Sequence, residues 1–185
     1  MEIEVNAEAK DKALNRRVAI TVVVLSVFAG LCNIKDGNVV QAMQQAQAAS
    51  LDKWNEYQAT RTKQHLEESS RATISALVAD PKRAAPVLAQ ADANIAKYKG
   101  EAPGLAKQAK DQSDLYDALN VHDDQFDAGD AALTTAISIA AVTALTESNL
   151  LMWVAWAFGA FGIFMGLCGF LKLPFHPDVL ATILG

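Results

Sequence analysis

Apolar runs alternate with polar segments along the chain, and three of these runs are candidates for membrane-spanning helices. Residues 18–34 and 131–145 contain no charged side chain, and residues 150–173 contain only Lys172, near their end. About 20 consecutive apolar residues cross a bilayer core about 30 Å thick. The pattern therefore predicts an all-α protein with three transmembrane helices, over residues 18–34, 128–145 and 150–173.

The last two apolar runs each place their smallest residues on one helical face. In lipid, helices associate by close backbone approach, which small side chains permit. We expect these faces to pack helix against helix and to serve oligomerisation or binding to a larger membrane complex. The residues are Ala128, Ala132, Ala136, Ala140 and Ala144 in the first face, and Ala155, Gly159, Gly162, Gly166 and Gly169 in the second.

Two of the runs have an alternative interpretation. The first follows Arg16 and Arg17, as the apolar region of a signal peptide would; we interpret it as a retained span, because Leu31 is not the small residue that a lipoprotein-type site needs before Cys32. The run 131–145 could be a buried core helix. Residues 146–149, however, are of suitable length for a turn between two antiparallel helices.

Basic residues near the ends of the spans predict the orientation of the chain. Four precede the first span, whereas the turn 146–149 has none. We therefore expect a protein of the bacterial inner membrane. Its tail 1–17 should lie in the cytoplasm, and its segment 35–127 and tail 174–185 should lie in the periplasm. The four basic residues are Lys10, Lys12, Arg16 and Arg17.

The segment 35–127 reads as helical throughout. Residues 38–79 contain neither Pro nor Gly, and Asp80-Pro81 ends that stretch because the residue before proline avoids the α region. A second helix is predicted over 82–99, ended by Gly100, Pro103 and Gly104, and a third over 105–126. The expected result is a three-helix antiparallel or coiled-coil-like stalk between spans one and two.

Two sequence motifs carry a family resemblance. Leu-Asp-Lys-Trp-Asn-Glu-Tyr-Gln-Ala at 51–59 is continued by Thr-Lys-Gln-His-Leu at 62–66, and Asp-Gln-Phe-Asp at 124–127 leads into Ala-Ile-Ser-Ile-Ala at 136–140, followed by Trp153. Over about residues 18–173 the chain resembles a bacterial membrane family known as domain of unknown function 4337 (DUF4337). The resemblance implies three spans, a helical segment between the first two, and no established activity. Members tend to carry Arg or Lys in the last turn, where this chain has Thr-Glu-Ser at 146–148.

Candidate sites are few. The acidic group at the end of the third predicted helix could coordinate a divalent ion through oxygens, but we favour a solvated juxtamembrane collar and predict no metal site. Cys32 and Cys168, at similar predicted depth, could form a disulfide; buried free thiols are the interpretation that we favour. The metal-ligand candidates are Asp123, Asp127, Asp130 and His122.

Trp54 and Tyr57 stand on an otherwise polar helix and are candidates for contact with a partner protein; packing within the stalk explains them as well. The net charge is −5, and no basic stripe points to nucleic acid. The sequence contains no phosphate-binding loop, nucleophile elbow or zinc-type cysteine spacing. We therefore expect the protein to have no enzymatic activity and no cofactor.

These observations predict a non-enzymatic integral membrane protein that contacts membrane lipids and acts as an oligomeric scaffold or as an accessory subunit of a larger membrane complex. The homo-oligomer and the mixed complex both stay open. The alternative is a small oligomeric channel or transporter with a polar path along the second span, where the hydroxyl-bearing residues are Thr134, Thr135, Ser138 and Thr143.

Overall fold

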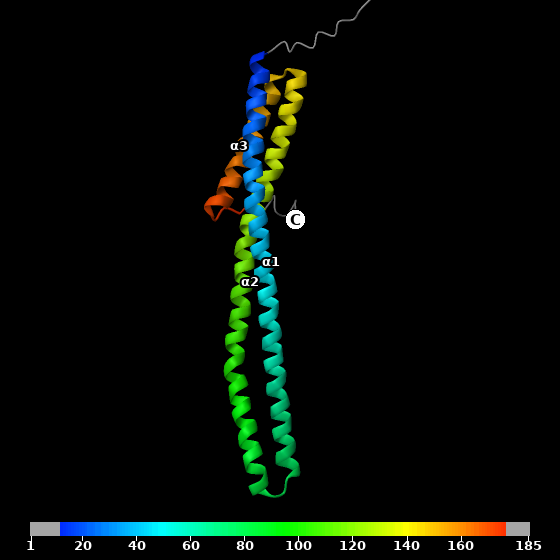
Figure 1. The fold of residues 1–185 in the computed structure, drawn as a ribbon, viewed down its shortest axis with the longest axis vertical. Coiled ribbons are helices and arrows are strands. Elements are labelled where there is room, and N and C mark those ends of the chain that lie inside the picture. Colours follow the sequence, from blue (N-terminus) through cyan, green and yellow to red (C-terminus); the bar gives the residue numbers. More distant parts are fainter. Residues whose placement is uncertain (1–11, 177–185) are drawn as a thin grey trace, which may run out of the picture. The chain divides into compact units, whose positions relative to one another are not determined.

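The structure, a computed structural model, describes residues 12–176 and is all-helical there (Figure 1). Helix α1 spans Lys12–Leu77, α2 spans Pro81–Thr146 and α3 spans Asn149–Leu171. Each helix is long and apolar enough to cross a membrane. The predicted all-α class and the three candidate transmembrane helices are thereby confirmed. Lys10 and most of the tail 174–185 lie outside the described residues.

The two turns between helices follow from local sequence. Asp80 accepts a hydrogen bond at Oδ1 from the backbone N–H of Lys82, at 3.0 Å, and so caps the start of α2. Pro81 takes the first helical position, where its missing N–H costs nothing. At the other turn, Glu147 adopts a left-handed backbone conformation with φ 51°, and Ser148 is the N-cap residue of α3.

The chain divides into two compact units, which we describe separately. The three-helix unit comprises the described parts of Met1–Gln41 and Ala118–Gly185, and the two-helix unit comprises Ala42–Asp117. Helices α1 and α2 each contribute to both units, whereas α3 belongs to the three-helix unit alone.

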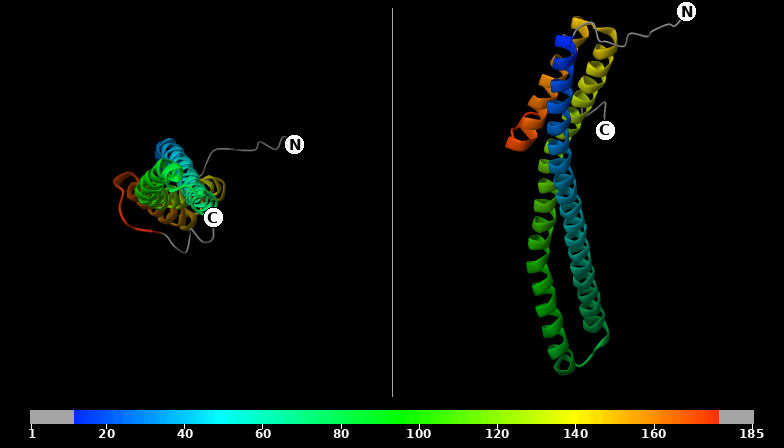
Figure 2. Two further views of the ribbon diagram at one scale, coloured as in Figure 1. Left: turned by 90° about the horizontal axis from the view of Figure 1, so that it is seen from below. Right: turned by 45° about the horizontal axis from the view of Figure 1, so that its top comes forward.

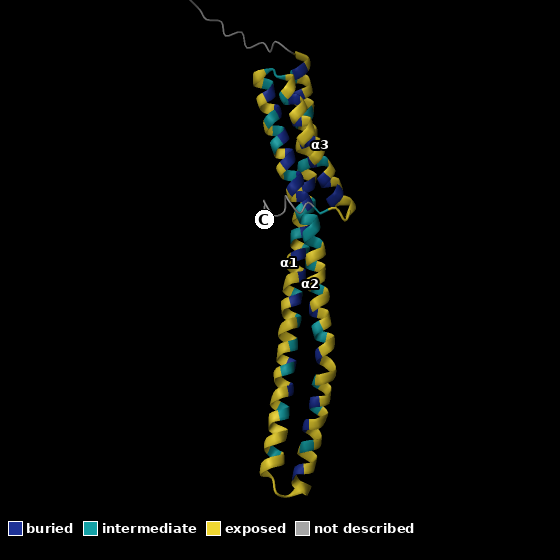
Figure 3. Cartoon of the chain, turned by 180° about the vertical axis from the view of Figure 1, so that it is seen from behind, coloured by how far each residue is buried: buried dark blue, intermediate teal, exposed yellow. Residues whose placement is uncertain are grey.

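The two-helix unit is a hairpin of α1 and α2, which run side by side (Figures 1 and 2). Its inward side chains recur at alternating steps of three and four residues, and most of them are small or polar. Ser50 Oγ donates a hydrogen bond to the carbonyl of Ala109 at 3.0 Å, Asn94 Nδ2 donates to Glu67 Oε1 at 2.9 Å, and Lys99 Nζ pairs with Glu68 Oε1 at 3.1 Å. The fully buried positions are 43, 46, 50, 60 and 64 on α1, and 84, 91, 95, 102 and 109 on α2 (Figure 3).

The hairpin corrects the prediction of three helices in this segment. Instead of ending at residue 99, α2 continues through Gly100, Pro103 and Gly104. Proline inside a helix costs about 3 kcal/mol and glycine about 1 kcal/mol relative to alanine. Ala102 within this stretch and Ala109 after it are both buried, and the carbonyl of Ala109 accepts a hydrogen bond from Ser50 on α1; this tertiary packing outweighs the local penalty.

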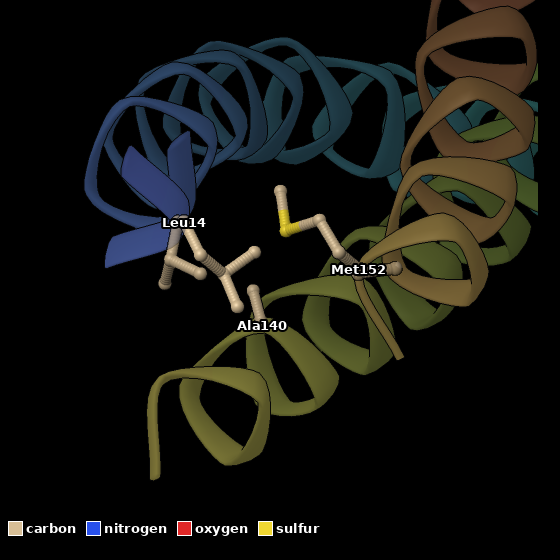
Figure 4. Packing of buried hydrophobic residues seen from close by; sticks show 5 residues of the cluster. Leu14, Ala140 and Met152 are labelled. Carbon is tan, nitrogen blue, oxygen red and sulfur yellow. The ribbon is translucent and has the colours of Figure 1, made fainter. Parts of the chain in front are cut away.

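In the three-helix unit, all three helices supply side chains to a shared core. Leu14 from α1, Ala140 from α2 and Met152 from α3 point toward one another (Figure 4). A second cluster joins Leu25 to Leu133 and Ala136. Because each cluster draws on more than one helix, the small-residue faces predicted from the sequence pack against other helices of the same chain.

Glycines on α3 allow this close approach. A Cβ atom built at Gly162 would lie 2.7 Å from Leu133 Cγ and 2.9 Å from the carbonyl oxygen of Gly129. A Cβ at Gly166 would lie 2.8 Å from Cys32 Sγ, and one at Gly169 would lie 2.7 Å from the ring of Phe126. No side chain larger than hydrogen fits these contacts without displacing a neighbour.

We expect Gly162→Ala to lower the thermal unfolding temperature of the protein in mild detergent. The added methyl group meets backbone at Gly129, which cannot move aside as a flexible side chain does, and overpacking of this kind costs about 1–3 kcal/mol. Gly30→Ala is the matched control, because nothing lies within 4 Å of a Cβ there. Equal unfolding temperatures for the two variants would contradict the packing described.

Candidate functional site

The most distinctive polar group of the three-helix unit is a cluster of aspartates between α1 and α2. Asp36 lies four residues after buried Cys32 and three before buried Val39, so it occupies the inward stripe of α1. Its carboxyl group lies near that of Asp123 on α2, close enough for Asp123 to act on its pKa through charge and hydrogen bonding. Both side chains are half-buried.

This environment favours the protonated form of Asp36. Burial raises the pKa of its carboxyl group to about 7, and the charge and hydrogen-bonding contact of Asp123 add to the effect, followed by the charges of Asp127 and Asp130. Burial also raises the pKa of Asp123, although less, because its contact with Asp36 favours its ionised form. Asp36 therefore keeps its proton to a higher pH than an ordinary aspartate does.

Beside this pair, a polar network binds the residues that follow α3. His176 Nε2 pairs with Asp124 Oδ2 at 2.8 Å. Gln125, whose side chain is fully buried, donates from Nε2 to the carbonyl of Leu173 at 2.8 Å and to that of Phe175. Neither the contact of His176 nor the role of Gln125 was predicted from the sequence.

The predicted metal-ligand candidates do not converge. His122 bonds through Nδ1 to Gln125 Oε1 at 3.1 Å, and Asp127 is exposed. In residues 12–176, no group of three or more His, Cys, Asp or Glu side chains is arranged to hold a metal ion. Asp36, which the sequence analysis left out, is the residue that contacts the cluster from α1. Its spacing could have indicated this position, because Asp36 lies four residues after Cys32 and three before Val39 and so shares their face of the helix.

The cysteine pair is not bonded. Cys32 and Cys168 are both buried and free in the structure, so the disulfide hypothesis has no support from it. Cys32 Sγ lies against α3 at Gly166, where it fills space as a small apolar side chain.

The partner candidates Trp54 and Tyr57 lie in the two-helix unit and contact each other edge to face, with ring centroids 5.5 Å apart. Tyr57 is half-buried toward α2, whereas 39% of Trp54 is exposed. Trp54 borders a groove of about 640 Å³ whose other wall comes from α2, including Lys107, Lys110 and Asp117. The two aromatic residues thus have different surroundings, and Trp54 is the one that a partner can reach.

The hydroxyl groups of the second span satisfy their hydrogen bonds locally. Thr135 donates to the carbonyl of Ala131 at 2.8 Å, and Thr143 donates to that of Ile139 at 2.9 Å. Ser138 donates to the carbonyl of Thr134, and both of these side chains are exposed, whereas Thr143 is buried. Within this chain, therefore, these four residues do not line one common path.

Helix α3 has small residues on its buried side and large apolar residues on its exposed side, and this distribution indicates the class of protein. The side of α3 that faces α1 and α2 is built largely from glycine and alanine, and its outward side carries exposed large residues, among them Trp153, Phe164 and Leu167. Exposed apolar surface of this extent is typical of contact with lipid. The fold is that of a three-span helical membrane protein.

A family match covers most of the chain, including parts of all three helices. The family described as Domain of unknown function (DUF4337) matches residues 14–172, and the chain belongs to it. This confirms the resemblance carried by the two sequence motifs. No curated protein and no solved structure matches the chain.

Replacing the buried amide of Gln125 should release the residues after α3. We expect Gln125→Leu, which nearly preserves volume, to destabilise the protein by about 1–2 kcal/mol through the loss of two hydrogen bonds to backbone carbonyls. Amide hydrogen exchange should rise in the peptide that contains residues 173–176. Gln108→Leu, at an exposed position of α2, is the control and should change neither quantity. Unchanged exchange in Gln125→Leu would rule out the anchoring role.

Proposed function

We propose that this protein is a non-enzymatic integral membrane protein that acts as an oligomeric scaffold or as an accessory subunit of a larger membrane complex. The proposal places it in a bacterial inner membrane, with its N-terminus in the cytoplasm and the two-helix unit in the periplasm. The support for this orientation is the group of basic residues before the first span, of which Lys12, Arg16 and Arg17 begin α1.

One observation carries the proposal. The two-helix unit has only two helices to bury its apolar side chains, and it leaves several large ones exposed on an otherwise polar surface. Leu51 is 59% exposed and Leu66 is 67% exposed, and Trp54 stands beside the groove described above. A helix normally buries its apolar stripe against another element. A further helix, from a second copy or from another subunit, would supply the missing cover.

The regular spacing of the inward residues supports the same proposal. Alternation of three and four residues is the pattern of a coiled coil, in which helices meet along a narrow seam. We propose that the two-helix unit is a coiled-coil hairpin and that its outer apolar residues form a second seam toward the partner. The small-residue faces of α2 and α3 are already occupied within the chain, so they do not serve this association.

Mass measurement of the full chain purified in mild detergent tests the proposal. We expect either more than one copy in each particle or a co-purifying membrane subunit. Trp54→Ala should weaken the association at least tenfold, because truncating a buried aromatic at an interface typically costs about 2 kcal/mol or more.

Trp153→Ala is the matched control for this substitution. Trp153 is an exposed aromatic residue on α3, in the three-helix unit. The control should leave the association constant unchanged. A strictly monomeric wild-type chain without any co-purifying protein would exclude the proposed function, and an effect of Trp153→Ala alone would move the interface to the lipid-facing surface.

A further inference from the structure

One buried oxygen atom in the three-helix unit has no hydrogen-bond partner. Asp36 Oδ1 is fully buried and, among the described residues, is the one buried side-chain nitrogen or oxygen without a partner. An unpaired buried oxygen costs free energy. The cost is larger when the group is charged, because burial disfavours the ionised form.

The contact between Asp36 and Asp123 has a simple chemical requirement. Two ionised carboxylates are both acceptors and repel each other, so they form no hydrogen bond. If one of them is protonated, its O–H donates to the other and the repulsion disappears. The close approach of these groups is thus compatible with one proton shared between α1 and α2.

We propose that Asp36 and Asp123 hold a single proton between them and that this proton acts as a pH-sensitive clasp between α1 and α2 in the three-helix unit. When the proton is present, the carboxyl pair joins the two helices. When it is lost, two negative charges face each other in a partly desolvated site and the helix contact loosens. This regulatory device goes beyond the proposed function and does not depend on it.

The groups around the pair do not supply a compensating positive charge. On α2, Asp127 and Asp130 add negative charge to the surroundings of Asp36, and Asp124 does so for Asp123. On α1, the neighbouring titratable groups are Cys32 and Lys35, and Lys35 is not among the groups whose charge acts on Asp36.

The elements after α2 offer no compensation either. Cys168 of α3 is a buried thiol, Lys172 is exposed, and His176 pairs with Asp124 rather than with Asp36 or Asp123. The proton is therefore the group in this structure that relieves the repulsion.

The direction of the pH effect follows from linkage. The pKa of Asp36 in the folded chain is about 7, above the ordinary value of 3.8 that applies to the unfolded chain. Stability is therefore fully present below the ordinary value and is lost as pH rises through about 7. We expect the unfolding temperature of the wild-type chain in detergent to fall as pH rises from about 4 to about 7 and to level off above that.

Infrared spectroscopy of the wild-type chain tests the proton directly. A protonated carboxylic acid has a C=O stretching band distinct from the carboxylate bands. We expect such a band at about pH 6 that disappears with an apparent pKa near 7, and we expect Asp36→Asn and Asp123→Asn each to abolish it. Absence of the band in the wild-type chain at about pH 6 would overturn the proposal without recourse to any variant.

Thermal unfolding of two variants separates the clasp from the nearby pair of His176 and Asp124. Asp36→Asn retains the shape of the protonated acid and should remove most of the pH dependence of the unfolding temperature between about pH 4 and about pH 7. His176→Gln should retain that dependence. The reverse result would assign the pH effect to the pair of His176 with Asp124 and contradict the clasp.

Thermal unfolding in the presence of divalent cations tests whether a metal ion, rather than a proton, occupies the aspartate pair. We expect the unfolding temperature at about pH 8 to be the same in excess Ca²⁺ or Mg²⁺ as in a chelator, because a proton rather than a metal ion occupies the pair. Stabilisation by either ion, lost in Asp36→Asn, would show that the cluster binds a cation and would overturn the proposal.

Discussion

Close backbone approach at glycine is the constraint on which the three-helix unit depends. Lipid surrounds apolar side chains as well as protein does, so burying them gains little in a membrane and helix association rests on dispersion contacts and shape. Gly162 and Gly166 of α3 bring the backbone of Gly129 on α2 within contact distance, and Gly169 receives the ring of Phe126. Large side chains consequently lie on the outside of α3, the reverse of the arrangement in a water-soluble bundle.

The two-helix unit follows the opposite logic. Its helices meet through small or polar residues such as Ser50, Gln64 and Ala109, and through hydrogen bonds and ion pairs between α1 and α2. Exposed ion pairs each contribute little to stability. A hairpin of this kind therefore gains much from a partner that covers its outer apolar residues, which is the physical basis of the proposed scaffold role. The three-helix unit, whose small-residue faces are already filled, needs no such partner to pack.

The aspartate pair differs from both kinds of contact, because its strength depends on a proton rather than on shape. Asp36 occupies a half-buried position on the inward stripe of α1, where its carboxyl group is partly desolvated. Such a position reports pH through the helix contact itself. The proposed scaffold can thus hold its helices with a strength that follows the surrounding proton concentration.

Local sequence determined the all-helical class, the three apolar spans, the turn at Asp80-Pro81 and the membership of the family, because these depend on hydrophobic runs, caps and motifs that are contiguous in the chain. It misled at Gly100, where a local helix-ending signal was overridden by packing against α1. It also gave no sign that Asp36 lies near Asp123. Only the tertiary structure decided that contact, and only it showed that the small-residue faces pack against helices of the same chain. Both depend on which helix lies opposite which, and periodicity within one helix carries no information about its neighbour.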